Sequence, residues 1–154
     1  MSEDRGGFAI ESTLDLTRPP DEVFDYLADT RSFKEVDAAL VEVEPQGKLE
    51  HGMSGRFLHR RSGLPAHSTW QVIELDAPRR LSVELRGMGY GLIEHAELEA
   101  TPSGTRVQFL VRVWPTSLAG RVMVALSGGI LRRDLRARAG RLKAVLERPV
   151  DLRT

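Results

Sequence analysis

The hydrophobic and polar positions of the chain follow two different periods. Up to about Thr116, apolar residues mostly alternate with polar ones, which is the pattern of strands that bury one face. From Ser117 to Glu147, apolar residues recur every three or four positions, which predicts one long amphipathic helix. Its predicted inner stripe comprises Leu131, Leu135, Ala139, Leu142 and Leu146. The pattern therefore predicts a sheet that packs against a C-terminal helix.

Seven strands are expected before this helix, separated by residues that favour turns. They comprise residues 8–17, 39–44, 53–61, 67–75, 80–86, 92–100 and 105–114. In the second of them, Ala39, Val41 and Val43 are taken as one face. The short connections between consecutive strands imply an antiparallel meander. With 154 residues, the chain is expected to be one domain spanning 1–154.

The segment between the first two strands predicts two short helices. Pro19 and Pro20, followed by two acidic residues, are a good start for the first helix. The second is expected at about 30–34, with Thr30 as its N-cap and Phe33 as its buried anchor.

Three local motifs accompany this order of elements: PPDEVFDYLAD at 19–29, APRRL at 77–81 and TPSGTRV at 101–107. The motifs and the order of the predicted strands and helices together resemble those of the START-like helix-grip superfamily, also called SRPBCC or polyketide cyclase/dehydrase-like. The resemblance implies an α+β helix-grip fold, in which a curved antiparallel sheet of about seven strands wraps a long C-terminal helix, with two short helices between strands one and two. It also implies a cavity between sheet and helix for a lipid-like, polyketide-like or other hydrophobic molecule.

Strand alternation selects the side chains that would face this cavity. Glu94 shares a face with Leu98, and His59 shares one with Phe57. Buried together, His59 and Glu94 would form an acid/base or ligand-orienting pair, whereas a register shift of one residue would turn both toward water. The expected ligand-binding set comprises Phe57, His59, Trp70, Val83, Leu85, Glu94, Phe109, Val111, Met123, Leu126 and Ile130, and Arg86 is a further residue considered for orienting a polar end.

Two functions remain open at this point. One is a carrier or sensor that binds a hydrophobic small molecule, and the other is a cyclase, aromatase or dehydratase acting on a polyketide-like substrate. We favour binding, because His59 and Glu94 are the only catalytic candidates that the pattern offers. A weaker third interpretation is an interaction module that uses a basic helix face.

The net charge is zero, but the C-terminal helix is basic. Residues 118–148 contain Arg121, Arg132, Arg133, Arg136, Arg138, Arg141, Lys143 and Arg148 against Asp134 and Glu147. We interpret this as a solvated outer face whose cations suit the helix dipole, with an anionic membrane or nucleic acid as the alternative. Aromatic residues do not alternate with basic ones on any strand, so no nucleic-acid partner is expected.

Several chemistries are excluded or not expected. Without cysteine, the chain has no disulfide, thiolate nucleophile or thiolate metal ligand. His51, His59, His67 and His95 lack the spacing of metal ligands, so no metal is expected. The glycine-rich stretch 87–91 precedes a strand rather than a helix, so no phosphate-bearing cofactor is expected. The chain shows neither a secretion signal nor a run that could span a bilayer, which suggests a cytoplasmic protein.

A glycine pair at 128–129 interrupts the C-terminal helix. Leu118, Val122, Met123 and Leu126 before it, together with Ile130 directly after it, form a stripe on nearly the opposite side from the stripe that begins at Leu131. The glycine pair would kink the helix, or the first segment would be buried on all sides, against a partner chain or over the cavity mouth. We therefore predict a gripping segment from about Leu131 to Leu146, after a separately oriented, mobile segment from Leu118 to Leu126. A homodimer is one state that this allows.

Overall fold

Seven strands form one antiparallel sheet in the computed structural model, which describes residues 6–61 and 63–148. The elements are β1 (Phe8–Leu16), α1 (Pro20–Leu27), the 3₁₀ turn η2 (Thr30–Ser32), α2 (Phe33–Val36), β2 (Leu40–Glu44), β3 (Ser54–Arg61), β4 (Leu64–Asp76), β5 (Arg80–Gly87), β6 (Tyr90–Thr101), β7 (Gly104–Pro115) and α3 (Leu118–Leu146). The strand order is β1-β7-β6-β5-β4-β3-β2. The predicted meander from β2 to β7 is thus confirmed, and β1 adds to it beside β7.

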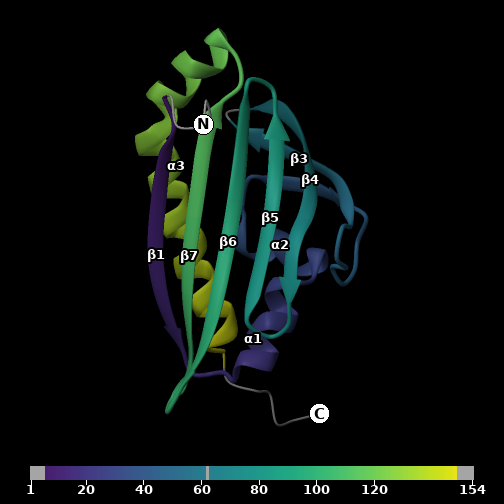
Figure 1. Cartoon of the computed structure of the whole chain (residues 1–154), viewed down its shortest axis with the longest axis vertical. Coiled ribbons are helices and arrows are strands. Elements are labelled where there is room, and N and C mark those ends of the chain that lie inside the picture. Colours follow the sequence, from purple (N-terminus) through teal and green to yellow (C-terminus); the bar gives the residue numbers. More distant parts are fainter. Residues whose placement is uncertain (1–5, 62, 149–154) are drawn as a thin grey trace.

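The helices cover one face of the curved sheet, as Figure 1 shows. There α3 runs behind β1 and β7, while α1 and α2 lie behind the strands toward the other edge. The predicted α+β helix-grip architecture, with short helices between the first two strands, is therefore confirmed.

Two apolar clusters lie between the sheet and the helices. The larger one includes Val23, Phe57, Trp70, Val107, Leu142 and Leu146 among its buried residues. The smaller one is built on Val111, Val113 and Val124, with Phe8, Tyr90, Leu92, Leu131 and Leu135 packed against it. The last two turns of α3 thus belong to the larger cluster, and its earlier part belongs to the smaller one. The predicted stripe from Leu131 to Leu146 does face the sheet.

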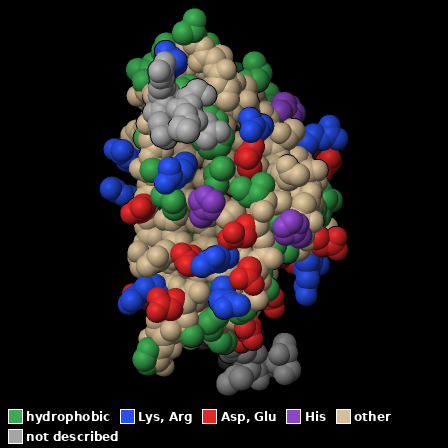
Figure 2. All heavy atoms as spheres, in the orientation of Figure 1, with side chains coloured by type: hydrophobic (Ala, Val, Ile, Leu, Met, Phe, Trp, Pro, Cys, Tyr) green, Lys and Arg blue, Asp and Glu red, His purple; other side chains and the backbone are tan. Residues whose placement is uncertain are grey.

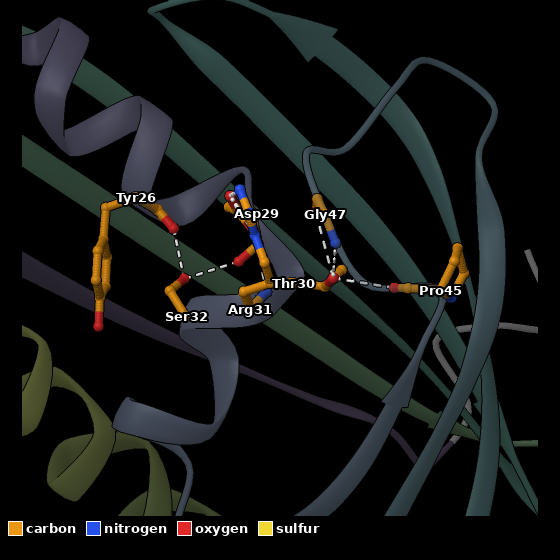
Figure 3. Close-up of polar contacts among 7 residues, drawn as sticks. All are labelled: Tyr26, Asp29, Thr30, Arg31, Ser32, Pro45 and Gly47. Carbon is orange, nitrogen blue, oxygen red and sulfur yellow. Dashed lines mark hydrogen bonds and ion pairs between the residues drawn. The ribbon is translucent and has the colours of Figure 1, made fainter.

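The connection between α1 and β2 is fixed by buried hydroxyl groups (Figure 3). The hydroxyl of the fully buried Thr30 donates to the carbonyl of Pro45 at 2.9 Å and accepts from the N–H of Gly47 at 2.9 Å. Ser32 Oγ donates to the carbonyls of Tyr26 and Asp29 at 2.6 and 2.8 Å. The Thr30 bonds tie η2 to the connection between β2 and β3, and the Ser32 bonds join η2 to the end of α1.

The expected N-cap at Thr30 is wrong. Asp29 caps η2, because its carboxylate accepts from the N–H of Arg31 at 2.9 Å, whereas the Thr30 side chain is used for the loop contacts just described. Phe33 is half-buried and packs against the larger cluster, with its ring centroid 6.1 Å from that of Phe57.

The expected alternation of the second strand is also wrong. β2 begins at Leu40, and its pairing with β3 shifts between Leu40 and Glu42. Such a bulge places one extra residue between the two that point inward. Leu40 and Val43 are therefore buried, whereas Val41, which the alternation had placed on the inner face, is 37% exposed.

α3 is one uninterrupted helix through Gly128 and Gly129, so the residues from Leu118 to Leu126 do not form an element of their own, and their exposure contradicts burial on all sides. Ser117 caps it by accepting from the N–H of Gly120 at 2.9 Å. Figure 1 shows that the helix axis changes direction along its length, but the helix does not break. The buried side continues backward from Leu131 through Gly128 and Val124, at spacings of three and four residues. Val122 lies in solvent at 61% exposure.

Candidate functional site

An ion pair crosses the interior between α3 and β6. Arg138 Nη2 lies 3.0 Å from Glu94 Oε1, and the two side chains are 34% and 26% exposed. Glu94 shares the inner face of β6 with the buried Ala96 and Leu98, as strand alternation predicts. Its strand neighbours are Val83 on β5 and Val111 on β7, so a carboxylate stands in an otherwise apolar row.

A second polar pair lies at the start of β2. His59 Nε2 donates to Asp37 Oδ2 at 3.1 Å, and the side chains are 15% and 18% exposed. His59 is on the inner face of β3, where its ring lies edge-on to Phe57 with centroids 5.7 Å apart. Asp37 follows α2 directly and also accepts from the N–H of Ala39 at 3.0 Å. The short helices and the bulged β2 thus place a carboxylate beside His59.

The two pairs share one electrostatic environment. Burial would raise the pKa of Asp37, but the hydrogen bond from His59 and the charge of Arg138 hold it below its usual value. The Glu94 carboxylate raises the pKa of Arg138 against the effect of burial, and Asp37 adds to this increase. The Asp37 carboxylate therefore stays ionised at neutral pH, and the carboxylates of Asp37 and Glu94 face one guanidinium. We call Asp37, His59, Glu94 and Arg138 the inner polar cluster.

Within the described part of the chain, three buried side-chain polar atoms have no hydrogen-bond partner. They are Ser68 Oγ, Trp70 Nε1 and Arg138 Nε. Ser68 and Trp70 point inward from β4 and are 6% and 2% exposed. The Trp70 ring stacks on Phe57 at 5.7 Å between centroids. Because a buried unpaired donor is costly, these atoms favour a bound water or a polar ligand atom nearby.

The structure brings His59 and Glu94 into one inner region, but it does not pair them with each other. Phe57, Trp70, Val83 and Val111 are buried, and Leu85 and Phe109 are partly buried against the larger cluster. Solvent reaches the inner polar cluster, whose members are partly exposed. The inner-face candidates on the strands therefore surround the cluster with apolar surface.

Three candidates on α3 do not face the interior. Leu126 and Ile130 are 76% and 61% exposed, and Met123 is 39% exposed, because the side of α3 that packs on the sheet carries Val124 and Leu131 instead. Arg86 also points away from the interior, since it lies on the outer face of β5 and its Nε contacts Glu84 Oε1 at 2.6 Å.

Sequence reasoning missed Asp37 and Arg138. Arg138 follows Leu135 by three residues and precedes Leu142 by four, so the helical period places it as close to the buried stripe as Ala139. An arginine at a stripe position was thus a signal that could have been used. Asp37 lies in a connection after a helix of four residues, and no sequence pattern identifies its partner.

Two hollows in the described part of the chain lie elsewhere. One, of about 360 Å³, is a groove on the outer side of β3 to β5 lined by residues that include Arg56, Gln71 and Glu84. The other, of about 330 Å³, lies between the edge strand β1 and α3, with Ile10 and Arg136 among its lining residues. Neither hollow is lined by a residue of the inner polar cluster.

Among residues 6–61 and 63–148, no three His, Asp or Glu side chains come together in a way that could hold a metal ion. No helix in the same part of the chain is long and apolar enough to cross a membrane. His67 is exposed, and His95 Nδ1 lies 2.5 Å from Ser82 Oγ, away from the inner polar cluster.

The inner polar cluster has both donors and acceptors for a polar group. Arg138 offers guanidinium N–H donors, and the carboxylates of Asp37 and Glu94 accept. With its Nε2–H directed at Asp37, a neutral His59 keeps an acceptor lone pair on Nδ1. A hydroxyl group, which both donates and accepts, matches this set better than a further carboxylate would.

Solved structures of several proteins are similar to this fold. The protein CV1439 from Chromobacterium violaceum has a TM-score of 0.74 at 15% identity, covering 92% of this chain and 99% of its own. The di-domain ARO/CYC StfQ from the steffimycin biosynthetic pathway has a TM-score of 0.75 at 11% identity, covering 94% of this chain and 52% of its own. Ara h 8.0201 has a TM-score of 0.64 at 14% identity, covering 90% and 99%. At these identities the likeness shows the fold alone.

No curated protein sequence matches the chain. A family model does match, over residues 8–147, which takes in every strand and helix described above. The family is described as polyketide cyclase / dehydrase and lipid transport. Sequence motifs, fold and family match agree, and the chain belongs to this family of the helix-grip superfamily.

Proposed function

We propose that the protein binds a hydrophobic small molecule, lipid-like or polyketide-like, between the sheet and α3, as a carrier or sensor. The observation that carries this proposal is the inner polar cluster, in which Arg138 and Glu94 form a half-buried ion pair beside buried apolar side chains. An ion pair in such surroundings is weak support for stability alone, because desolvation offsets much of its attraction. Its place beside Phe109 and Val111 suits a ligand with one polar end.

The charges of the cluster indicate which polar end fits. Asp37 and Glu94 are two carboxylates that face the single guanidinium of Arg138. A ligand carboxylate would add a third negative charge in a region of low dielectric, where repulsion is strong. We therefore expect a hydroxyl or phenol group to be preferred over a carboxylate on the same hydrocarbon.

Intrinsic fluorescence tests this binding. In a Trp114→Phe variant, Trp70 is the one tryptophan left, and it reports on the inner face of β4. Titration with a long-chain alcohol or a planar phenol is expected to change its emission saturably, and the matching carboxylic acid is expected to bind more weakly. Replacing Arg138 by Met should lower the affinity about tenfold, the usual effect of losing a hydrogen bond to a charged group. No saturable change with any of these probes would refute the proposal.

The second candidate function is that of a cyclase, aromatase or dehydratase acting on a polyketide-like substrate. The contact of 3.1 Å between His59 and Asp37 favours it, because a carboxylate that holds one ring nitrogen orients an imidazole for general base catalysis. His59 Nδ1 would then remove a proton from a carbon beside a carbonyl, as a cyclisation requires.

Two substitutions, each with a matched control, distinguish the enzyme from the binding protein. His59→Gln and Glu94→Gln are each compared with a substitution of the same type away from the cluster, His67→Gln and Glu97→Gln. If the protein is an enzyme, His59→Gln and Glu94→Gln should lose turnover of a poly-carbonyl substrate while keeping their affinity for it. If only affinity changes and no turnover is found in the unsubstituted protein, the protein is a binder.

A further inference from the structure

The first half of α3 leaves an apolar ridge in solvent. This α3 ridge comprises Leu118, Val122, Leu126 and Ile130. The exposed fractions are 79%, 61%, 76% and 61% in that order. The four residues follow one another at intervals of four, so they lie one above the other along the helix. Soluble proteins seldom expose a contiguous apolar patch of this kind without an interaction partner.

The turn between β5 and β6 extends the ridge. Met88 in this turn is 89% exposed. The turn lies beside the start of α3, because the N–H of Thr116 donates to the Gly89 carbonyl at 2.8 Å, and a Cβ on Gly89 would come within 3.1 Å of Gly120 Cα. Figure 2 shows hydrophobic side chains projecting at this end of the molecule.

The second half of α3 is basic on its exposed sides. Arg132, Arg133, Arg136, Arg141 and Lys143 are all exposed. The one acidic residue of this helix, which the structure describes throughout, is the half-buried Asp134. Arg133 follows Ile130 by three residues, which continues the line of the α3 ridge into the basic half.

Several exposed arginines of the sheet lie beside acidic residues. Arg80 lies 3.6 Å from Glu97, and Arg106 lies 2.9 Å from Asp15, so each is neutralised by an acid on the neighbouring strand. Figure 2 shows acidic and basic side chains intermingled over this face. The concentration of positive charge on α3 is therefore a local feature of a chain whose net charge is zero.

We propose that the outer side of α3 docks on the surface of an anionic lipid bilayer. The α3 ridge and Met88 insert among the lipid headgroups, and Arg133 and Arg136 contact lipid phosphates. An interfacial helix binds membranes through this combination of buried apolar area and attraction between basic residues and anionic lipid. A second copy of the chain would cover the ridge but would leave the basic half of α3 without a partner, whereas an anionic bilayer covers both.

This docking does not depend on the proposed ligand. The ridge lies on the side of α3 opposite Val124 and Leu131, which pack on the sheet, and the inner polar cluster lies between helix and sheet. Arg138→Met should therefore change ligand affinity without changing membrane binding.

Flotation with vesicles tests the proposal. The full chain is mixed with vesicles of phosphatidylcholine alone, or of equal parts phosphatidylcholine and phosphatidylglycerol. We expect it to float with the anionic vesicles and to stay behind with the neutral ones. Most of the binding should be lost in about 1 M salt, where the Debye length falls to about 3 Å.

Two double variants separate the apolar and the basic contributions. Leu126→Gln with Ile130→Gln should lower the partition coefficient about tenfold or more, because two large apolar side chains no longer enter the bilayer. Arg133→Gln with Arg136→Gln should lower it about fivefold for each arginine removed. Ile73→Gln on β4 and Arg79→Gln in the turn after β4 are the matched controls and should partition as the unsubstituted protein does. All of these residues are exposed, and circular dichroism confirms that each variant is folded.

Three results would overturn the proposal. The first is the absence of binding to the anionic vesicles. The second is binding that the ridge variant and the arginine variant leave unchanged. The third is a dimer in sedimentation equilibrium that the ridge variant converts to a monomer, since a second copy would then occupy the ridge.

Discussion

Arg138 Nη2 and Glu94 Oε1, 3.0 Å apart, join α3 to β6 across the interior of the protein. Replacing Arg138 leaves two carboxylates, those of Glu94 and Asp37, without their shared cation. Neutralising Glu94 instead leaves Arg138 with Asp37 as a nearby negative charge. Both side chains are partly exposed, so the cost lies between that of surface and buried pairs. We predict that Arg138→Met lowers the free energy of unfolding by about 2 kcal/mol and Glu94→Gln by about 1 kcal/mol. Urea unfolding checks this order, and equal or reversed costs would contradict it.

The lowered pKa of Asp37 predicts how stability depends on pH. Because its folded pKa lies below the unfolded value of about 3.9, Asp37 contributes stability above that value. This contribution is lost as the pH falls through the folded pKa. Asp37→Asn should therefore be less stable than the unsubstituted protein at pH 7, and the difference should shrink as the pH falls below about 4. Thermal unfolding across this range measures it, with the exposed Asp25→Asn as control. A difference that is independent of pH would show that Asp37 acts only through packing.

Two glycines of α3 should respond in opposite directions to replacement by alanine. A Cβ at Gly129 would meet nothing within 4 Å, so Gly129→Ala should stabilise the protein by about 1 kcal/mol through helix propensity. A Cβ at Gly120 would overlap the carbonyl oxygen of Gly89, so Gly120→Ala should cost about 2 kcal/mol or more. Melting temperatures of the two variants provide the comparison. A destabilising Gly129→Ala would mean that the glycine pair is needed for the bend of the helix.

The hydrogen bonds of the buried Thr30 hydroxyl should contribute more to stability than the volume of the Thr30 side chain does. Thr30→Val keeps the shape but leaves the Gly47 N–H and the Pro45 carbonyl without this partner. We predict a loss of about 2 kcal/mol, typical for a buried group left unsatisfied. Thr13→Val, at an exposed position of β1, should change stability by less than about 0.5 kcal/mol. Urea unfolding of both variants tests this, and similar effects would argue against a role for the hydrogen bonds.

The strands and helices could be predicted well from the sequence because the hydrophobic patterns extend over many residues at a regular period. The alternation at Val107, Val111 and Val113 and the helical stripe at Leu142 and Leu146 each bury the expected residues. Where a local feature changed the period, the prediction failed: the bulge in β2 turned Val41 outward.

The candidate site was predicted in part. His59 and Glu94 were found because strand alternation fixes which face a residue is on. Their partners Asp37 and Arg138 were missed, because contacts between distant segments depend on how the sheet curves around α3. The exposed Leu126 was misplaced for a related reason, since an apolar stripe on a helix does not by itself show which side meets the sheet.

Native mass spectrometry of gently purified protein tests the central claim most directly. The claim is that a hydrophobic molecule binds between the sheet and α3, beside the inner polar cluster. We predict a mass excess in the native spectrum that disappears on denaturation, and a released molecule that is largely apolar and bears a hydroxyl or phenol group. The excess should be reduced in Arg138→Met and unchanged in the control Arg79→Gln. A native mass equal to that of the bare chain, with no uptake of added long-chain alcohol or phenol, would contradict the claim.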